Sequence, residues 1–431
     1  MGGLARSAAG IGHLNIVHFS TSDREGGSAR SARRISDHLQ RLGHRSRMLV
    51  GYRSGVDPDT DTVHGGGVRR LADRLAEEAT RRVGLQYLWY PSGRRVLRHP
   101  WVTSADVIQL YNTHGGYFSH RLLPALAARA PLVWRLSDMW ALTGHCAYSG
   151  SCDRWRTGCG ACPDLVTYPA LPRDTTRLLW RAKKSIYARA RPVIVAPSRW
   201  LEEIARESPL FAGLPVHRIP NGVDRSVFRP IPKPAARELL GLPPDARIVL
   251  YVAQVLDDNA RKGSADAIAA CHALKGRAAF DLALLGSGGA SWREKLPQTI
   301  HALGYVHDER LLAASYAAAD LTIVPSRVEN LPNSILESLA CGTPVVAYDS
   351  GGIGDAVRHE ETGLLARTGA REALADAMAR LLADAALRER LSRNAVALIA
   401  KEFDAAREAR AFADLFASLT SRPREAGHAA G

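Results

Sequence analysis

Two glutamates stand eight positions apart, at Glu329 and Glu337, in the segment VPSRVENLPNSILESLACGTPVV. An apolar run lies before them, and a helical pattern, a Gly-Thr-Pro turn and a second apolar run follow. Carboxylates can accept hydrogen bonds from sugar or ribose hydroxyls. The amides at the start of a helix, here those of Asn333, Ser334 and Ile335, favour an anion. A nucleotide sugar requires both kinds of group.

Glu337 also has a purely structural explanation. Ser334 and Glu337 fit the S-x-x-E capping box, which predicts that the next helix begins at Ser334. Under that alternative Glu337 caps its own helix and takes no part in binding. The spacing alone leaves both explanations open.

The elements that would position these residues are short β-rich runs, each followed by a Gly/Pro/Asn loop and a helical period. Strands that alternate with helices predict parallel sheets with helices on both faces, and thus an α/β fold. Two such series, separated near residues 218–232, predict two doubly wound domains that bind ligands beyond the carboxyl ends of the strands. The predicted strands are residues 14–20, 47–51, 105–111, 131–137 and 192–198 in the first series, and 247–254, 280–286, 320–326 and 343–349 in the second.

The composition is that of a globular chain with more than one domain. Its 431 residues exceed one ordinary core, and 46% hydrophobic with 23% charged residues argues against disorder. Its apolar runs are too short to span a bilayer and its start lacks an apolar leader core, so a cytoplasmic location is expected. The net charge of +14 predicts an acidic partner (nucleotide phosphates, anionic lipid or nucleic acid), unless it reflects only a solvated surface.

The spacing of Glu329 and Glu337 resembles the E-x7-E motif of retaining glycosyltransferases of family 4, which have the GT-B fold. Residues 326–355 look like the donor-site block of that family almost throughout. Further blocks follow in the family's order, and the likeness extends over roughly residues 14 to 415. These blocks are residues 25–44, 196–200, 219–224, 261–263, 284–289 and 303–306.

The resemblance implies two Rossmann-like domains that face each other across a cleft. It implies an acceptor-side domain over residues 1–215 and a nucleotide-sugar donor domain over 216–402. Residues 403–431 would form a helix that returns to the N-terminal domain, followed by a frayed tail. The implied reaction moves a sugar from a donor such as a UDP- or GDP-sugar to a hydroxyl of a glycan, lipid-linked glycan or secondary metabolite, with retention of anomeric configuration. No catalytic metal is implied.

The family's functional residues can be transferred to matching positions. Lys262 would neutralise the donor diphosphate, Glu329 would hold the transferred sugar, and Glu337 would bind the ribose. Gly26 and Gly27 match a loop whose backbone approaches the donor phosphates, although an ordinary strand–helix turn is the alternative. The remaining donor-side candidates are Asn221, Gln254, Arg261, Gly286, Asn330, Leu331, Asn333 and Ser334.

Two positions depart from the family pattern. Gln254 stands where the family often has an arginine, and Arg261 could supply the missing charge. Ser137 and Asp138 stand where a related subgroup has His-Asp, which makes Asp138 the acceptor-side catalytic candidate. His114, after a predicted strand, would either take an acceptor role or be a surface loop histidine.

Four cysteines are clustered with the spacing C-x5-C-x6-C-x2-C. Grouped thiolates with a terminal C-x-x-C suit a tetrahedral structural zinc site, while reduced packing cysteines or labile disulfides are the alternatives. The same positions recur in a subgroup that resembles enzymes of exopolysaccharide synthesis, where the cluster would fasten a loop beside the acceptor cleft. These residues are Cys146, Cys152, Cys159 and Cys162.

Other functions remain as alternatives. A GT-B sugar-nucleotide epimerase or hydrolase would consume the donor without an acceptor. A basic nucleic-acid-binding protein would bind any duplex with strong salt dependence, but the chain has no recognised binding motif and nucleic acid is not expected. The basic and aromatic residues 67–101 would either contact anionic lipid weakly or form a helical hairpin beside the acceptor cleft. With the lipid contact, the protein would be peripheral at the inner face of a membrane. The oligomeric state is not predicted.

Overall fold

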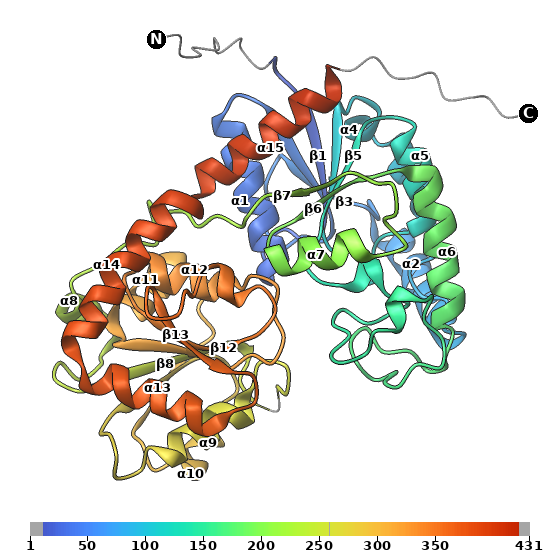
Figure 1. Cartoon of the computed structure of the whole chain (residues 1–431). Coiled ribbons are helices and arrows are strands. Elements are labelled where there is room, and N and C mark those ends of the chain that lie inside the picture. Colours follow the sequence, from blue (N-terminus) through green and yellow to red (C-terminus); the bar gives the residue numbers. More distant parts are fainter. Residues whose placement is uncertain (1–11, 258, 422–431) are drawn as a thin grey trace, which may run out of the picture. The chain divides into compact units, whose positions relative to one another are not determined.

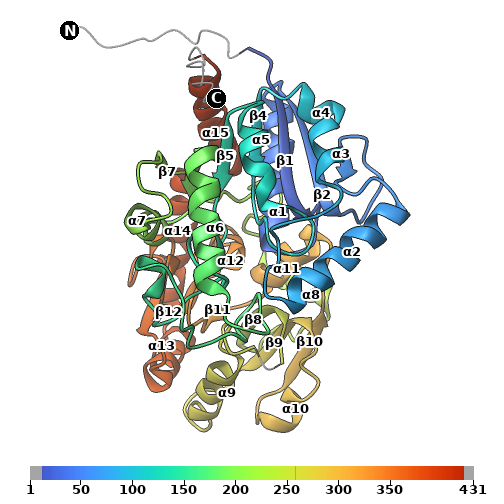
Figure 2. The same cartoon turned by 90° about the vertical axis from the view of Figure 1, so that its right-hand side faces the viewer.

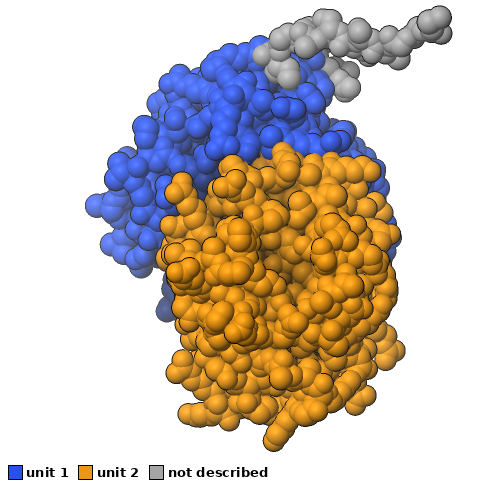
Figure 3. Space-filling view, turned by 90° about the vertical axis from the view of Figure 1, so that its left-hand side faces the viewer, with its two compact units in different colours: residues 1–196, 202–219, 406–431 blue, residues 197–201, 220–405 orange. Residues whose placement is uncertain are grey.

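The computed structural model describes residues 12–257 and 259–421, and it divides into two compact units. The part of the predicted frayed tail beyond residue 421 lies outside the described residues. Among the described residues, no helix combines the length and the apolar character that crossing a membrane requires. Unit 1 contains residues 1–196, 202–219 and 406–431, and unit 2 contains residues 197–201 and 220–405 (Figure 3).

Unit 1 is built on a parallel sheet of seven strands in the order β3-β2-β1-β4-β5-β6-β7. The chain begins in the middle of the sheet, winds to one edge, and then returns to wind towards the other. The order therefore reverses between β1 and β4, and such a reversal point is where ligands bind in doubly wound sheets. The strands are β1 (Asn15–Ser22), β2 (Arg45–Tyr52), β3 (Thr60–Thr62), β4 (Val107–Leu110), β5 (Leu132–Arg135), β6 (Val193–Ala196) and β7 (Val216–Arg218).

The last helix of the chain, α15 (Ala405–Thr420), completes the core of unit 1. Phe412 and Phe416 of this helix share an apolar cluster with Ile16 of β1 and Val133 of β5. Figures 1 and 2 show α15 beside the unit 1 sheet. This packing confirms the predicted return of the C-terminal helix. The earlier helices are α1 (Gly27–Arg41), α2 (Gly67–Arg82), α3 (Gly93–Arg98), α4 (Pro100–Thr103), α5 (Leu123–Ala127), α6 (Thr176–Ala190) and α7 (Arg199–Glu207).

Unit 2 repeats the same winding on a parallel sheet of six strands, in the order β10-β9-β8-β11-β12-β13. Here the order reverses between β8 and β11. Both units are thus doubly wound α/β structures, which confirms the predicted fold class. The strands are β8 (Ile248–Val255), β9 (Asp281–Ser287), β10 (Ile300–Gly304), β11 (Leu321–Val324), β12 (Val345–Asp349) and β13 (Gly363–Arg367).

Helices cover both faces of the unit 2 sheet (Figure 1). Because successive strand residues point to opposite faces, Ile248 and Leu250 of β8 join an apolar cluster with α11 and α12. Val249 and Tyr251 join a second cluster with α9 and α13. The helices are α8 (Lys233–Leu240), α9 (Ser264–Ala273), α10 (Trp292–Lys295), α11 (Glu309–Ala318), α12 (Asn333–Ala340), α13 (Arg371–Ala383) and α14 (Ala385–Glu402).

Candidate active site

Two loops of unit 2 bring a lysine, an arginine and a glutamate together. They follow β8 and β11, the neighbouring strands between which the strand order reverses. Lys262 Nζ lies 2.6 Å from Glu329 Oε1, and Arg261 forms an ion pair with the same carboxylate. Two cations and one carboxylate from distant positions, with Arg261 standing 68 residues before Glu329, therefore form one cluster.

The cluster is buried on its acidic side and open on its basic side. The Glu329 side chain is 8% exposed, whereas those of Arg261 and Lys262 are 39% and 20% exposed. Burial alone would raise the pKa of the Glu329 carboxyl, but the charges of Lys262 and Arg261 and their hydrogen bonds hold it below its usual value. Glu329 is therefore ionised at neutral pH, and the two cations retain accessible surface for an anion.

The backbone around Lys262 is fixed by local contacts. Its amide donates to Asn259 Oδ1 at 3.1 Å, and its carbonyl accepts from the Tyr251 hydroxyl at 3.3 Å. Gly263 has a φ of +72°, and a Cβ there would come within 1.9 Å of the Pro325 carbonyl oxygen, so a larger residue does not fit. Asn259 was not predicted; asparagine is a residue whose side chain often accepts from a backbone amide a few positions further on.

The Glu329 loop is held from two sides. The Arg327 amide donates to the Arg261 carbonyl at 2.9 Å, which ties the loop to the one that carries Lys262. The Gly352 amide donates to the Glu329 carbonyl at 3.0 Å. The carboxylate is therefore presented by a backbone that main-chain hydrogen bonds fix on both sides.

Asn330 and Leu331 connect this loop to other parts of unit 2. Asn330 Oδ1 accepts from Ser198 Oγ at 2.6 Å, and Asn221 Nδ2 donates to the Leu331 carbonyl at 2.9 Å. Asn330 and Asn221 are both buried. In this structure, then, these contacts of Asn330, Leu331 and Asn221 hold the loop in place.

Helix α12 begins differently from the capping-box prediction. It starts at Asn333 after Pro332, and no side-chain hydrogen bond caps it. The Ile335 amide donates to the Pro332 carbonyl at 3.1 Å, so it is not turned to an external anion as predicted. The capping box at Ser334 is therefore wrong, because the proline in extended conformation ends the loop one residue earlier.

Glu337 lies on the buried face of α12 and is 2% exposed. The Tyr316 hydroxyl donates to its Oε2 at 3.0 Å. Glu337 is therefore neither the capping residue of the structural alternative nor a solvent-exposed carboxylate. Its carboxylate forms a buried polar contact with α11.

A second acidic group at this end of the unit 2 sheet was not predicted. Asp266, in the first turn of α9, accepts from Arg327 at 2.8 and 3.0 Å and from Arg371 at 2.6 Å. Burial opposes its charge, but the hydrogen bonds and charges of both arginines lower the pKa of the Asp266 carboxyl. The cluster fixes the side chain of the residue two positions before Glu329. No spacing in the sequence signals it, because its members come from three separate segments.

The two other donor-side candidates lie on strands. Gln254 is exposed near the end of β8, and Gly286 is buried in β9 against the Ala253 carbonyl. It is Arg261, and not Gln254, that brings a second positive charge to Glu329.

A second group of candidates lies at the corresponding reversal point of unit 1. Gly26 and Gly27 follow β1, His114 follows β4, and Asp138 follows β5. His114 Nε2 lies 3.0 Å from Asp138 Oδ2, and the histidine is 4% exposed. The surface-histidine alternative is therefore wrong, since His114 is buried and hydrogen-bonded to the predicted acidic residue.

Hydrogen bonds connect the loops of this group. Ser28 Oγ and Ser137 Oγ are 2.8 Å apart, which joins the start of α1 to the loop that carries Asp138. Thr21 Oγ1 donates to the His114 carbonyl at 3.3 Å. A Cβ added to Gly26, the residue that precedes α1, would have open space around it.

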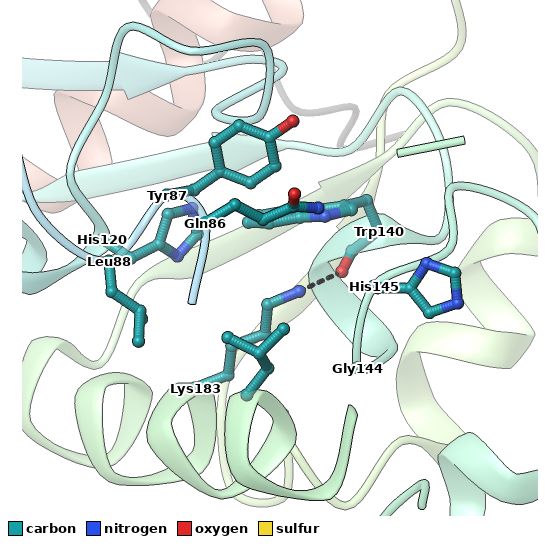
Figure 4. A pocket seen from close by; sticks show the side chains of 9 residues that line it. Gln86, Tyr87, Leu88, His120, Trp140, Gly144, His145 and Lys183 are labelled. Atoms are coloured by element: carbon teal, nitrogen blue, oxygen red, sulfur yellow. Dashed lines mark hydrogen bonds between the residues drawn. The ribbon is translucent and has the colours of Figure 1, made fainter. Parts of the chain in front are cut away.

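The loop that carries Asp138 is hydrogen-bonded to the buried Lys183. Trp140 N donates to Asp138 Oδ1 at 2.9 Å, and Lys183 Nζ donates to the Thr143 carbonyl at 3.0 Å. Lys183 Nζ also donates to the Trp140 carbonyl at 2.5 Å (Figure 4). Lys183 also lies 3.4 Å from the centroid of the Trp140 ring. Burial lowers the pKa of Lys183 to about 7. The small cavity beside it has a volume of about 10 Å³, room for no more than a water molecule.

The four clustered cysteines line one cavity of about 20 Å³, and all are free. Among the described residues, no group of three or more histidine, cysteine or acidic side chains is arranged to hold a metal ion, so the zinc prediction is not supported. Cys159 Sγ accepts from the Gly144 amide, and Cys162 Sγ donates to the Asp164 carbonyl. Burial raises the pKa of the thiols of Cys146, Cys159 and Cys162.

Both halves of the chain match known sequence families. Residues 25–227 match the family described as Glycosyltransferase Family 4, and residues 246–384 match Glycosyl transferases group 1. Together with the two doubly wound units, these matches support a glycosyltransferase with the GT-B fold.

Individual relatives agree with this assignment. D-inositol 3-phosphate glycosyltransferase of Thermobispora bispora is 42% identical over 33% of this chain, which spans only 37% of that relative. 2-Deoxystreptamine N-acetyl-D-glucosaminyltransferase of Streptomyces fradiae is 29% identical over 72% of this chain and 71% of its own. Among solved structures, Anabaena Alr3699/HepE in complex with UDP-glucose has a TM-score of 0.65 at 18% identity, covering 94% of this chain and 100% of its own. At that identity it shows the fold alone.

Proposed function

We propose that this chain transfers a sugar from a nucleotide-sugar donor to a hydroxyl acceptor, with retention of anomeric configuration. The observation that carries the proposal is the cluster of Lys262, Arg261 and Glu329 at the reversal point of the unit 2 sheet. Accessible cations beside an ionised, buried carboxylate suit a ligand that joins a diphosphate to a polyol. The Anabaena structure with UDP-glucose makes a UDP-sugar the first donor to test.

In this proposal each member of the cluster has a separate task. Lys262 and Arg261 bind the donor diphosphate and stabilise the negative charge that grows on it as the glycosidic bond breaks. Glu329 accepts hydrogen bonds from hydroxyls of the transferred sugar. When the diphosphate binds, it replaces Glu329 as the principal partner of the two cations.

Unit 1 is proposed to bind the acceptor. His114 and Asp138 form a buried hydrogen-bonded pair beside the glycine loop at Gly26, within the same unit. Such a pair can orient an acceptor hydroxyl through the imidazole. A new bond forms between the acceptor oxygen and the anomeric carbon, the bond to the diphosphate breaks, and the hydroxyl proton passes to the leaving phosphate.

Two assignments depend on the family resemblance. Retention is one, and the binding of the donor ribose by Glu337 is the other. For Glu337 the buried contact with Tyr316 favours a structural contribution as well, so Glu337→Gln should raise the KM for the donor and lower stability together. Nuclear magnetic resonance of the product anomer tests retention.

The function is tested by a thermal-shift screen with UDP-, GDP-, ADP- and dTDP-sugars, followed by mass spectrometry of products with candidate hydroxyl acceptors. We expect one nucleotide to stabilise the protein and a glycosylated product to appear only when an acceptor is present. Donor consumption at the same rate without any acceptor would instead identify a hydrolase or epimerase. Stabilisation by none of the four nucleotides would contradict the proposal.

A further inference from the structure

A cavity of about 570 Å³ in unit 1 is surrounded by arginines. Arg69 comes from α2, Arg94, Arg95 and Arg98 come from α3, and His99 follows them. Figure 2 shows α2, α3 and α4 together on one side of unit 1. A volume of this size lies within the range of small-molecule sites. This segment is rich in basic residues, and the proposed transfer reaction gives it no task.

Two of the residues that line the cavity, Arg95 and His99, are fixed by contacts with β3. Arg95 donates to the carbonyls of Thr62 and Val63 at 2.8 and 3.2 Å, which ties α3 to the edge strand β3. Asp61 of that strand accepts from both Arg95 and His99, at 3.2 and 3.1 Å. One carboxylate thus serves two basic side chains and has no further capacity to neutralise the cavity.

A second contact fixes the wall formed by α2. The buried Asp73 carboxylate accepts from the Ser92 amide at 3.0 Å, directly before α3 begins, and it also pairs with His64. The acidic Glu78, farther along α2, pairs with Arg81 and Arg82 instead. The acids of α2 that form these pairs are therefore committed elsewhere.

The other three arginines are not neutralised. Arg69, Arg94 and Arg98 are exposed, and among the described residues they have no hydrogen-bond or ion-pair partner. Arg94 and Arg98 are four positions apart on one helix, where like charges oppose each other. Three unpaired guanidinium groups around a supported cavity are suited to a multiply charged anion, because each can donate two parallel hydrogen bonds to phosphate oxygens.

We propose that Arg69, Arg94 and Arg98 form a binding site for a phosphate or diphosphate group carried by a second ligand, separate from the diphosphate cluster of unit 2. Val68, Leu71 and Leu75 of α2 are 85%, 58% and 64% exposed, and their spacing places them on one side of the helix. An apolar strip on the helix that contributes Arg69 would suit a phosphate borne on a lipid. The same arginines would also bind a soluble phosphate.

The test measures binding of inorganic pyrophosphate by calorimetry in a Lys262→Ala background, which removes the lysine of the other cationic cluster. Replacement of Arg94 and Arg98 by Gln should weaken binding at least about tenfold, because several charge-assisted hydrogen bonds are lost. The matched control, Arg81→Gln with Arg82→Gln, removes the same charge from α2 and should leave binding unchanged. Lysine at positions 94 and 98 should give an intermediate affinity.

A second arm distinguishes the source of the phosphate. Co-sedimentation uses vesicles of phosphatidylcholine with and without phosphatidic acid, and the same three sets of variants. Capture by phosphatidic acid that is lost with the Arg94 and Arg98 variants supports a lipid-borne ligand, and binding of pyrophosphate alone supports a soluble one. The proposal is overturned if neither probe binds, or if the control variants lose as much binding as the cavity variants.

Discussion

Two buried carboxylates of unit 2, each paired with a lysine and an arginine, lie at opposite ends of β11. Asp320 precedes the strand and accepts from Lys233, Arg237 and the Ile248 amide at 2.7, 2.9 and 2.8 Å. Glu329 follows the strand and pairs with Lys262 and Arg261 in two loops.

The two clusters differ in what surrounds their charges. Arg237 is 6% exposed and is also bonded to the Ala318 carbonyl, and Asp320 connects two neighbouring strands through the Ile248 amide. This contact is part of the sheet, and no ligand can replace it. Of this lysine and arginine at Asp320, only Lys233 reaches the surface, at 39% exposed, while Arg237 is closed off; at Glu329 both partners reach it, at 20% and 39%, so an anion can compete for both. The same kind of pairing therefore stabilises the fold at one end and forms the proposed donor site at the other.

The largest effect should come from Lys262→Ala. Transfer activity, measured as kcat/KM, should fall about a thousandfold, because a charge that faces the leaving group contributes about 4 kcal/mol. The melting temperature should stay close to that of the wild type, since Lys262 lies in a loop. The matched variant Lys233→Ala removes a lysine from Asp320 and should leave kcat/KM unchanged. Equal losses of activity would remove the distinction between the clusters.

The free energy of unfolding should fall more at Asp320 than at Glu329, the opposite order to that of activity. Asp320→Ala leaves buried Arg237 without its carboxylate, and we expect the free energy of unfolding to fall by about 3 kcal/mol. Glu329→Ala should cost less than about 1 kcal/mol, because its partners can turn to water, while transfer is abolished. Urea denaturation followed by circular dichroism gives both values. A larger loss of stability in Glu329→Ala would contradict the assignment.

Two glycines of unit 2 have left-handed backbones, and their variants test whether close packing holds the Glu329 loop. Gly351 has a φ of +57°, and a Cβ there would come within 1.9 Å of the Glu329 carbonyl oxygen, whereas Gly241 at +64° has open space. Gly241→Ala should cost about 1 kcal/mol through backbone strain alone. Gly351→Ala should cost about 2 kcal/mol or more and also lower activity, because the Glu329 loop must move. Equal stability and activity in the two variants would show that the loop is not held by this contact.

Lys183 of unit 1 is a buried lysine that pairs with no carboxylate among the described residues. Its pKa is lowered to about 7, so between pH 7 and its usual 10.5 the unfolded chain binds a proton that the folded protein does not. Stability should therefore rise with pH in this window, by up to about 1.4 kcal/mol per pH unit relative to Lys183→Met. Thermal melts of both proteins from pH 7 to pH 9 measure the difference. Parallel curves would mean that the lysine stays charged in the folded state.

The strands that could be predicted are those with apolar runs. All nine predicted strands are present, and both sheets have the expected winding. The missed strands are short or partly polar. β3, for example, is Thr-Asp-Thr, and only its pairing with Met48 and its neighbours in β2 makes it a strand. Pairing of that kind depends on the assembled sheet.

The candidate site divides in a similar way. Glu329 and Lys262 could be found because each belongs to a contiguous sequence block that resembles a block of the glycosyltransferase family. The pairing of His114 with Asp138, and that of Glu337 with Tyr316, could not be found, because each joins segments whose proximity only the fold creates. The four cysteines gave a metal-like spacing, but spacing does not fix the directions of the thiols.

The most direct test of the central claim is calorimetric binding of UDP, GDP, ADP and dTDP to the wild type, Lys262→Ala and a control, Lys275→Ala, which removes an exposed lysine elsewhere in unit 2. The account predicts that one nucleotide binds the wild type and the control equally, and Lys262→Ala about a hundredfold more weakly. Equal affinity of all three proteins would contradict the claim that Lys262 and its neighbours bind the diphosphate of the donor.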